Sequence, residues 1–357
     1  MATQPFDQAR VEAFAARMTA TLNDAFLAMM VSIGHQTALF DTMAKLPPAT
    51  SDEIARAAGL QERYVREWLG AVVTGGIVAY DPVRRTYAIP PEHAACLTRA
   101  AGAANLATSM LFVSCVGAVE PEVVQCFRQG GGVPYAAYGR FHEIMRSWSG
   151  QILDETLIES TLPLVPGLME RLQRGIDVLD VGCGSGHAIN LMGRAFSNSR
   201  FTGYDFSEEG LAAARAEASA WRLTNVDFVA QDVAAMTARG RFDFITAFDA
   251  IHDQAEPRRV LSGIAAALRP GGSFLMVDDR ASSHLHENLD HPLGPFLYGV
   301  STMHCMTVSL ALGGEGLGTV WGEQKARELL AEAGFSDVVV HQQPGDVANN
   351  YYVARLA

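Results

Sequence analysis

The residues best suited to chemistry follow a short apolar stretch, in F248-D-A-I-H-D-Q254. His252 and Asp253 are adjacent there, and His304 comes 52 residues after His252. A histidine can act as a general base near neutral pH while a carboxylate orients it. Two imidazoles and one carboxylate can instead form a facial triad of metal ligands with open positions for a substrate. A buried His–Asp pair with a purely structural role is the third interpretation, and the residues alone leave all three open.

A second candidate site is the glycine-rich turn in V178-L-D-V-G-C-G-S-G-H187. Here an apolar stretch carries an acid, Asp180, near its end. It runs into three alternating glycines, Gly182, Gly184 and Gly186. Glycines let the backbone turn tightly and approach a ligand closely. Two later apolar stretches are followed by Asp205 and Asp232. Because a carboxylate at the first of these positions can bind both ribose hydroxyls, and one at the second can bind an adenine amino group, the pattern predicts a nucleoside-containing cofactor.

These residues lie in a region, 171–357, where short apolar strands alternate with helical segments. The predicted strands are Asp177–Val181, Arg200–Tyr204, Val226–Ala230, Phe242–Phe248, Ser273–Val277, Val338–His341 and Tyr351–Arg355. The turn R269-P-G-G272 leads into the fifth of them. Alternating strands and helical crossovers predict an α/β fold with a mostly parallel, doubly wound sheet. In such a sheet ligands bind beyond the carboxyl ends of the strands, which is where the glycine turn and the acids fall.

Residues 1–100 have a different pattern, that of a winged helix. The predicted elements are a helix within residues 11–45, a helix with a capping box at Thr50 and Glu53 that stops at Gly59, a helix over 62–74, and a hairpin over 77–89. This segment contains nine Lys or Arg and ten Asp or Glu. A DNA-reading helix needs clustered basic residues, so the balance favours a dimerisation module.

Residues 101–170 are expected to form a helical linker that closes over a substrate. A long segment after the fifth strand, 278–321, is expected to build the rest of the pocket, with ordinary inter-helix packing as the alternative for each side chain. The candidate substrate residues are Tyr135, Tyr138, Phe141, His142, Trp148, Tyr298 and Trp321.

Bulk composition excludes several classes of protein. The net charge of −12 argues against a broad nucleic-acid-binding surface. The five cysteines are odd in number and lack CxxC spacing, which favours a reduced cytoplasmic protein over a disulfide framework or a paired-cysteine zinc site. The start, MATQPFDQAR, lacks the pattern of a signal peptide, and no apolar stretch is long enough to span a bilayer, so no membrane contact is expected.

The order of these motifs resembles the class I S-adenosylmethionine-dependent methyltransferases. The resemblance implies a Rossmann-like seven-stranded sheet whose last strand is antiparallel. It also implies cofactor contacts to the methionine part, ribose and adenine from Asp180, Gly182, Cys183, Gly184, Ser185, Gly186, Asp205, Phe206, Asp232, Val233 and Asp249. A winged helix ahead of this fold is similar to the small-molecule O-methyltransferases, which implies a homodimer.

The His–Asp pair with a later histidine is similar to the metal-dependent α-keto acid C-methyltransferases. That resemblance implies a zinc or iron ion held by His252, Asp253 and His304, and C-methylation of a 2-oxo acid bound through its carboxylate and keto oxygen. The alternatives are metal-free O- or N-methylation with His252 as general base, and a winged-helix regulator that binds the cofactor as a signal.

Overall fold

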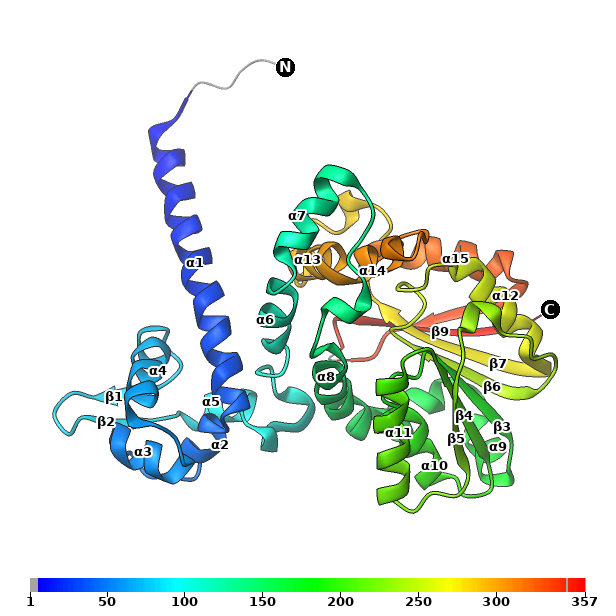
Figure 1. Ribbon diagram of the computed structural model, residues 1–357, viewed down its shortest axis with the longest axis horizontal. Coiled ribbons are helices and arrows are strands. Elements are labelled where there is room, and N and C mark those ends of the chain that lie inside the picture. The colour runs from blue at the N-terminus through cyan, green and yellow to red at the C-terminus, as the bar shows by residue number, and fades with distance from the viewer. Residues whose placement is uncertain (1–5, 345, 357) are drawn as a thin grey trace. The chain divides into compact units, whose positions relative to one another are not determined.

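The computed structural model describes residues 6–344 and 346–356. The chain forms two compact units, one ending at Ser114 and one beginning at Cys115, which Figure 1 colours blue to cyan and green to red. The helical segment expected over residues 101–170 is therefore divided between the two units.

The first unit is a winged helix, as predicted. Its elements are α1 (Gln8–Gln36), α2 (Leu39–Met43), α3 (Ser51–Ala58), α4 (Glu62–Thr74), β1 (Ala79–Asp81), β2 (Thr86–Ala88) and α5 (Pro91–Leu97). The capping box starts α3: Thr50 Oγ1 accepts a hydrogen bond from the Glu53 amide, and the Glu53 carboxylate accepts one from the Thr50 amide. The single helix expected over 11–45 is two helices, because the backbone turns at Ala38 with a φ of 55°.

The core of the first unit lies where α1 ends and packs on α2, α3 and α4. The Trp68 ring contacts Phe40 edge-on, and its Nε1 donates to the Met30 carbonyl at 2.8 Å. Most of α1 lies outside this core. One side of it carries exposed apolar residues at helical spacing, here called the apolar stripe of α1: Val11, Phe14, Met18, Leu22, Phe26, Met29 and Ile33.

The second unit contains a sheet flanked by helices. The strands are β3 (Asp177–Val181), β4 (Arg200–Asp205), β5 (Val226–Ala230), β6 (Phe242–Phe248), β7 (Leu268–Asp279), β8 (Phe335–His341) and β9 (Asn349–Leu356). The helices are α6 (Leu111–Gly117), which begins in the first unit, α7 (Glu120–Gln129), α8 (Phe141–Thr156), α9 (Leu168–Arg174), α10 (His187–Ala195), α11 (Glu208–Ala220), α12 (Pro257–Ala267), α13 (Gly294–Val300), α14 (Met306–Ala311) and α15 (Gly322–Glu332).

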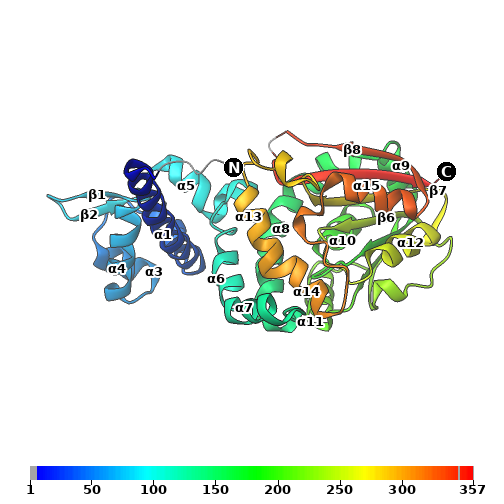
Figure 2. The same cartoon turned by 90° about the horizontal axis from the view of Figure 1, so that it is seen from above.

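The strands form one sheet in the order β5-β4-β3-β6-β7-β9-β8, with β9 antiparallel to both of its neighbours. The predicted seven-stranded, doubly wound fold with an antiparallel last strand is confirmed. Buried side chains of α9, α10 and α11 pack on one face of the sheet, and those of α12 and α15 pack on the other. Figure 2 shows helices along both sides of the strands. The carboxyl ends of β3, β4, β6 and β7 consequently open toward one edge of the sheet.

None of the helices in the described part of the chain combines the length and apolar character needed to cross a bilayer.

Candidate active site

In the glycine turn after β3, the backbone is open to a ligand at one glycine and closely packed at the other two. Gly182, Gly184 and Gly186 all have positive φ, at 71°, 52° and 70°. A Cβ on Gly182 would lie 2.7 Å from the Cβ of Ala250, and one on Gly186 would lie 2.5 Å from that of Ala214. No heavy atom lies within 4 Å of the corresponding point at Gly184. The outer glycines therefore serve packing, whereas Gly184 faces space that a ligand can enter.

Asp205 at the end of β4 holds this turn in place. Its Oδ2 accepts a hydrogen bond from the Gly184 amide and its Oδ1 accepts one from the Ser207 amide, both at 2.8 Å. The next side chain, Phe206, is 58% exposed. A carboxylate fixed from two sides next to an exposed aromatic ring is a suitable binding site for a nucleoside.

The other predicted cofactor residues border the same edge of the sheet. Asp180 is buried under the turn, where it accepts a hydrogen bond from Thr246 Oγ1 at 2.7 Å, and burial raises its pKa to about 7. Cys183 and Ser185 are half-buried in the turn. After β5, Asp232 is exposed and caps a short helical turn through the Ala234 amide, while Val233 is buried.

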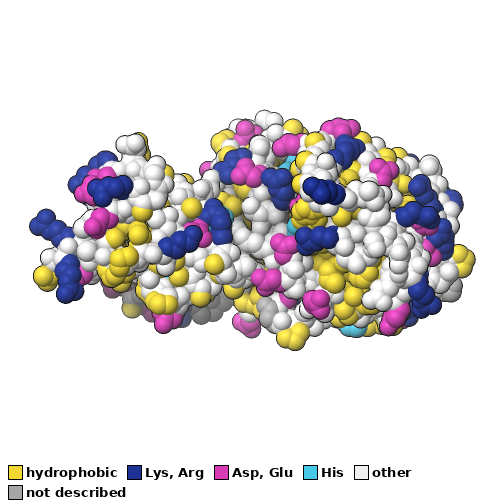
Figure 3. Space-filling model, turned by 90° about the horizontal axis from the view of Figure 1, so that it is seen from below, with side chains coloured by type: hydrophobic (Ala, Val, Ile, Leu, Met, Phe, Trp, Pro, Cys, Tyr) yellow, Lys and Arg dark blue, Asp and Glu magenta, His cyan; other side chains and the backbone are white. Residues whose placement is uncertain are grey.

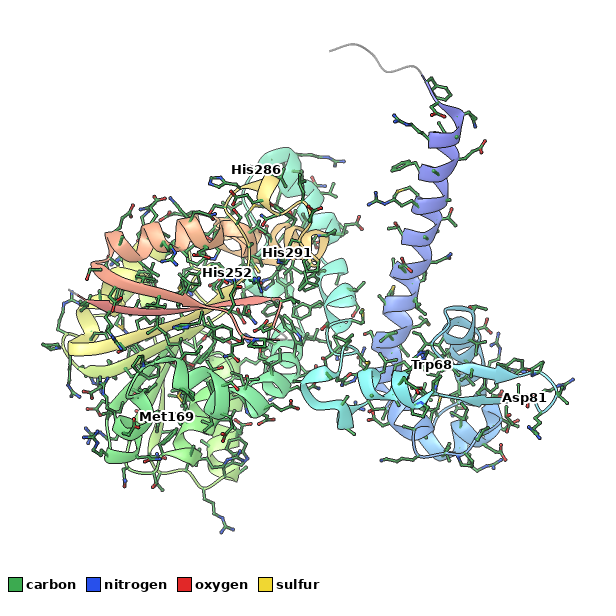
Figure 4. All side chains as sticks on the ribbon, turned by 180° about the vertical axis from the view of Figure 1, so that it is seen from behind. Trp68, Asp81, Met169, His252, His286 and His291 are labelled. Atoms are coloured by element: carbon green, nitrogen blue, oxygen red, sulfur yellow. The ribbon has the colours of Figure 1, made fainter. Side chains whose placement is uncertain are left out.

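His252 lies in the interior of the second unit beyond β6, whereas His286 lies at the surface (Figure 4). His252 Nδ1 is 2.8 Å from Oδ1 of Asp278, and the same oxygen accepts a hydrogen bond from Trp321 Nε1 at 2.8 Å. An oxygen that already accepts from Trp321 fixes the hydrogen of His252 on Nδ1. The other nitrogen, Nε2, then faces Oδ1 of Asp253 at 3.3 Å.

Negative charge is in excess around this imidazole. Burial opposes ionisation of His252, but the carboxylates of Asp278 and Asp253 raise its pKa well above the usual value. Burial, together with Asp278, raises the pKa of Asp249 to about 7. Burial likewise raises the pKa of Asp279 well above its ordinary value. A group of four acids around one histidine calls for a further cation or for shared protons.

His304 is completely buried in η7 (Ser301–Cys305), a π-helical turn between α13 and α14. Its ring stacks on Phe141 at 3.8 Å. Its Nδ1 is 3.9 Å from Oδ2 of Asp253 and 3.6 Å from Sγ of Cys305. Burial lowers the pKa of His304 to about 4, so the imidazole is neutral at physiological pH.

Four of the predicted substrate residues form one aromatic group next to His304: Tyr135, Tyr138, Phe141 and His142. Tyr138 Oη donates to the Met303 carbonyl at 2.5 Å. His142 Nε2 is 2.9 Å from Ser207 Oγ, beside the carboxyl end of β4. This group therefore connects the two halves of the site.

The remaining three predicted substrate residues lie outside this aromatic group. Trp148 is half-buried further along α8. Tyr298 Oη accepts a hydrogen bond from Asn288 Nδ2 at 3.1 Å. Trp321 is buried behind Asp278, where it orients that carboxylate and packs in the core with α12 and α15.

Three residues that the sequence prediction did not single out belong to the site. Asp278 and Asp279 end β7, and two consecutive acids at the carboxyl end of a buried strand are a signal that could have revealed them. Cys305 directly follows His304, and both side chains are buried within the π-helical turn η7. The sequence pattern did not predict this turn.

Two family comparisons cover separate parts of the chain. Residues 25–99 match a family described as the Rv2258c-like winged HTH domain, and residues 172–334 match a methyltransferase domain. The chain thus joins a winged helix-turn-helix domain to a methyltransferase domain of the class I fold.

Among curated proteins, the ubiquinone biosynthesis O-methyltransferase of Coxiella burnetii is 34% identical over 102 residues, and that of Erwinia tasmaniensis is 36% identical over 100 residues. The first match covers 28% of this chain and 42% of the relative, and the second covers 28% and 40%. The chain thus spans less than half the length of these relatives.

Solved structures resemble the chain over nearly its whole length. The mitomycin 7-O-methyltransferase MmcR has a TM-score of 0.72 at 17% identity, covering 98% of this chain and 100% of that one. Human N-acetylserotonin methyltransferase, solved with S-adenosylmethionine, has a TM-score of 0.70 at 16% identity, covering 99% of each chain. At these identities the likeness establishes the fold.

Proposed function

We propose that the protein is an S-adenosylmethionine-dependent methyltransferase that acts on a small molecule. The observation that carries this proposal is the open glycine turn at Gly184, pinned by Asp205, inside a domain that matches methyltransferases. The methionine part of the cofactor carries an ammonium group and no pyrophosphate. The acids Asp180 and Asp249 suit that positive charge, which supports this cofactor over a dinucleotide.

When bound, the cofactor supplies an activated methyl group. The protein then has to bind the acceptor in line with it and exclude water, and such positioning supplies much of the rate. Tyr135, Tyr138 and Phe141 offer apolar walls for this purpose beside His304.

We further propose metal-assisted C-methylation of a 2-oxo acid. Of the buried polar atoms in the described residues that lack a hydrogen-bond partner, three lie here: Asp253 Oδ1, Asp278 Oδ2 and His304 Nε2. Asp253 Oδ1 faces His252 Nε2 at 3.3 Å. A histidine whose other nitrogen donates to a carboxylate, as His252 does to Asp278, is the usual arrangement of a metal ligand. His252 and Asp253 therefore offer donors for a cation, and His304 is the third ligand that the sequence predicts. The ion would act as a Lewis acid toward a keto oxygen.

The metal-free alternative is less well supported by the same geometry. A general base must be unprotonated at its reactive nitrogen. Without a cation, the carboxylates around His252 raise its pKa, which favours the protonated imidazole. His252 would then be a poor acceptor for a proton from an O–H or N–H substrate.

The regulator alternative is opposed by the charges of the winged helix. Three of the four arginines of α4 and the wing pair with neighbouring acids: Arg63 with Glu67, Arg66 with Glu62, and Arg84 with Asp81. Figure 3 shows Lys and Arg beside Asp and Glu on one face of this unit. A surface of this kind offers few unpaired cations to phosphates.

The apolar stripe of α1 supports a homodimer. Two surface hollows of about 210 and 420 Å³ continue it at the base of the helix, both lined by Ile33, Tyr64 and Trp68. Contiguous exposed apolar surface of this kind is typical of a protein interface. We infer that a second copy of the chain covers it. The five free cysteines support a reducing, cytoplasmic location.

Two measurements test the enzyme proposal. Calorimetry of the purified protein with S-adenosylhomocysteine should detect binding, and NAD should give none. Methyl transfer from S-adenosylmethionine should then be assayed with 2-oxo acids and with phenols, before and after removal of metal by a chelator. Activity on 2-oxo acids that the chelator abolishes and zinc or iron restores is expected. Full activity in chelator would contradict the metal-assisted reaction, and absence of cofactor binding would contradict the whole proposal.

A further inference from the structure

We propose that Cys305 is a metal ligand of this site, together with His252 and Asp253, and that His304 orients the thiolate instead of binding the ion. This inference rests on the metal-assisted version of the proposed function and changes its ligand set. It also changes the preferred ion, because a thiolate favours zinc over hard cations such as magnesium and calcium.

The spacing of the donor atoms is the first observation. Among the described residues, His252, Asp253 and Cys305 can each offer one ligand atom such that all three lie within 4.8 Å of one another. His252 Nε2 and Asp253 Oδ1 are 3.3 Å apart. Two light atoms bound tetrahedrally to zinc at about 2.0–2.1 Å lie about 3.3 Å apart. The pair therefore already has the separation that a shared zinc ion requires.

His304 has a different relation to this group. It does not belong to the set of donors that meet the 4.8 Å limit with His252. Its Nδ1 instead makes a 3.6 Å hydrogen-bond contact with Cys305 Sγ and lies 3.9 Å from Asp253 Oδ2. A neutral imidazole with hydrogen on Nδ1 can donate to a thiolate, which is how an outer group holds a metal ligand. Stacking on Phe141 fixes the ring in that position.

The local backbone explains why adjacent residues both reach the site. A regular α-helix points successive side chains in clearly different directions. The π-helical turn η7 interrupts the helix formed by α13 and α14, and both His304 and Cys305 are buried within it. Such turns occur often at functional sites. The turn thus serves to bring a thiol and an imidazole to the same carboxylate.

The chemistry balances as a simple exchange of a proton for a metal ion. The thiol of Cys305 loses its proton to solvent as the metal–sulfur bond forms, and no redox step is involved. Three protein ligands leave the fourth tetrahedral position open, which is the arrangement of catalytic zinc sites. That position is where a keto oxygen would bind.

Cobalt(II) substitution of the metal-free, full-length protein tests this inference by spectroscopy. The wild type should show thiolate-to-cobalt charge-transfer absorption in the near ultraviolet. Cys305→Ser should lose this absorption and bind zinc at least about tenfold more weakly in competition with a chelator. His304→Gln should keep the absorption. Cys126→Ser, which changes a half-buried cysteine on α7, is the matched control and should behave as the wild type.

The possible outcomes distinguish the role of Cys305 from the metal-assisted reaction itself. Cobalt binding without thiolate absorption, or absorption that survives Cys305→Ser, would overturn the role of Cys305 and leave the set of His252, Asp253 and His304. Failure of the wild type to bind cobalt or zinc would remove the metal-assisted reaction as well. Calorimetry with S-adenosylhomocysteine on every variant reports whether it is folded, independently of the metal.

Discussion

At the residue scale, Asp278 decides how His252 can act. Its Oδ1 accepts hydrogen bonds from both His252 Nδ1 and Trp321 Nε1, so it fixes the ring and turns Nε2 toward Asp253. Substitution Asp278→Asn should lower zinc affinity by about 10–100-fold, the usual effect of removing a partner that orients a metal ligand. Chelator competition measures the change. Asp337→Asn, at an exposed position in β8, should leave the affinity unaltered.

Asp205 provides a second test at this scale. Hydrogen bonds to a charged group contribute roughly 1.5–3 kcal/mol each. Loss of the two proposed ribose contacts should therefore weaken S-adenosylhomocysteine binding by at least about 100-fold. Calorimetry of Asp205→Ala measures this effect, with Asp227→Ala, an exposed acid in β5, as control. Unchanged affinity in Asp205→Ala would refute the ribose assignment.

Individual site residues were predictable from sequence where the signal is local. The glycine turn and Asp205 stand in a short, regular motif that specifies its own geometry. Asp278 was not identifiable as the partner of His252, because their contact depends on the pairing of β6 with β7 across 26 residues. Trp321 was predicted as a substrate residue. Its hydrogen bond to Asp278 was not predictable, because it joins residues 43 positions apart that no local pattern connects.

At the element scale, short strands were predicted more accurately than the long strand β7. The predicted ranges of β3, β5 and β6 agree with the structure at both ends. β7 begins five residues earlier than expected, at Leu268, and continues to Asp279. Its far end is paired with Asn349 of β9, a long-range partner that a local pattern does not show.

The first residue of α10 gives an element-scale prediction. His187 Nδ1 is 2.9 Å from Glu217 of α11, and its Nε2 is 3.2 Å from Asp154 of α8. Burial opposes it, but these partners raise the pKa of His187 above 6.5. A raised histidine pKa stabilises the fold fully below pH 6.5, and this stability is lost as pH rises through the folded value.

Replacement by His187→Gln should therefore lower the melting temperature by about 2–4 °C at pH 6, for roughly 1 kcal/mol of lost stability, and by less at pH 9. Differential scanning calorimetry across this range measures the difference. The surface variant His286→Gln should melt like the wild type at each pH. An effect of His187→Gln that grows with pH would show that the assigned direction is wrong.

At the scale of the whole molecule, the apolar stripe of α1 predicts how copies associate. Leu22→Glu with Phe26→Glu places two charges in the inferred interface, and burying an unpaired charge is costly. Sedimentation should show a dimer for the wild type and a monomer for this double variant. Leu289→Glu, at an exposed leucine of the second unit, should remain a dimer. A dimer that survives the double substitution would place the interface elsewhere.

The contact between His142 and Ser207 has a consequence for turnover. Ser207, two residues after Asp205, caps α11 by accepting a hydrogen bond from the Gly210 amide. Its Oγ also contacts His142 of α8. Any movement of α8 away from the sheet has to break this contact, and it leaves the start of α11 with one partner fewer. We therefore expect release of the methylated product to weaken the binding of S-adenosylhomocysteine. Both products would then leave in the same opening event.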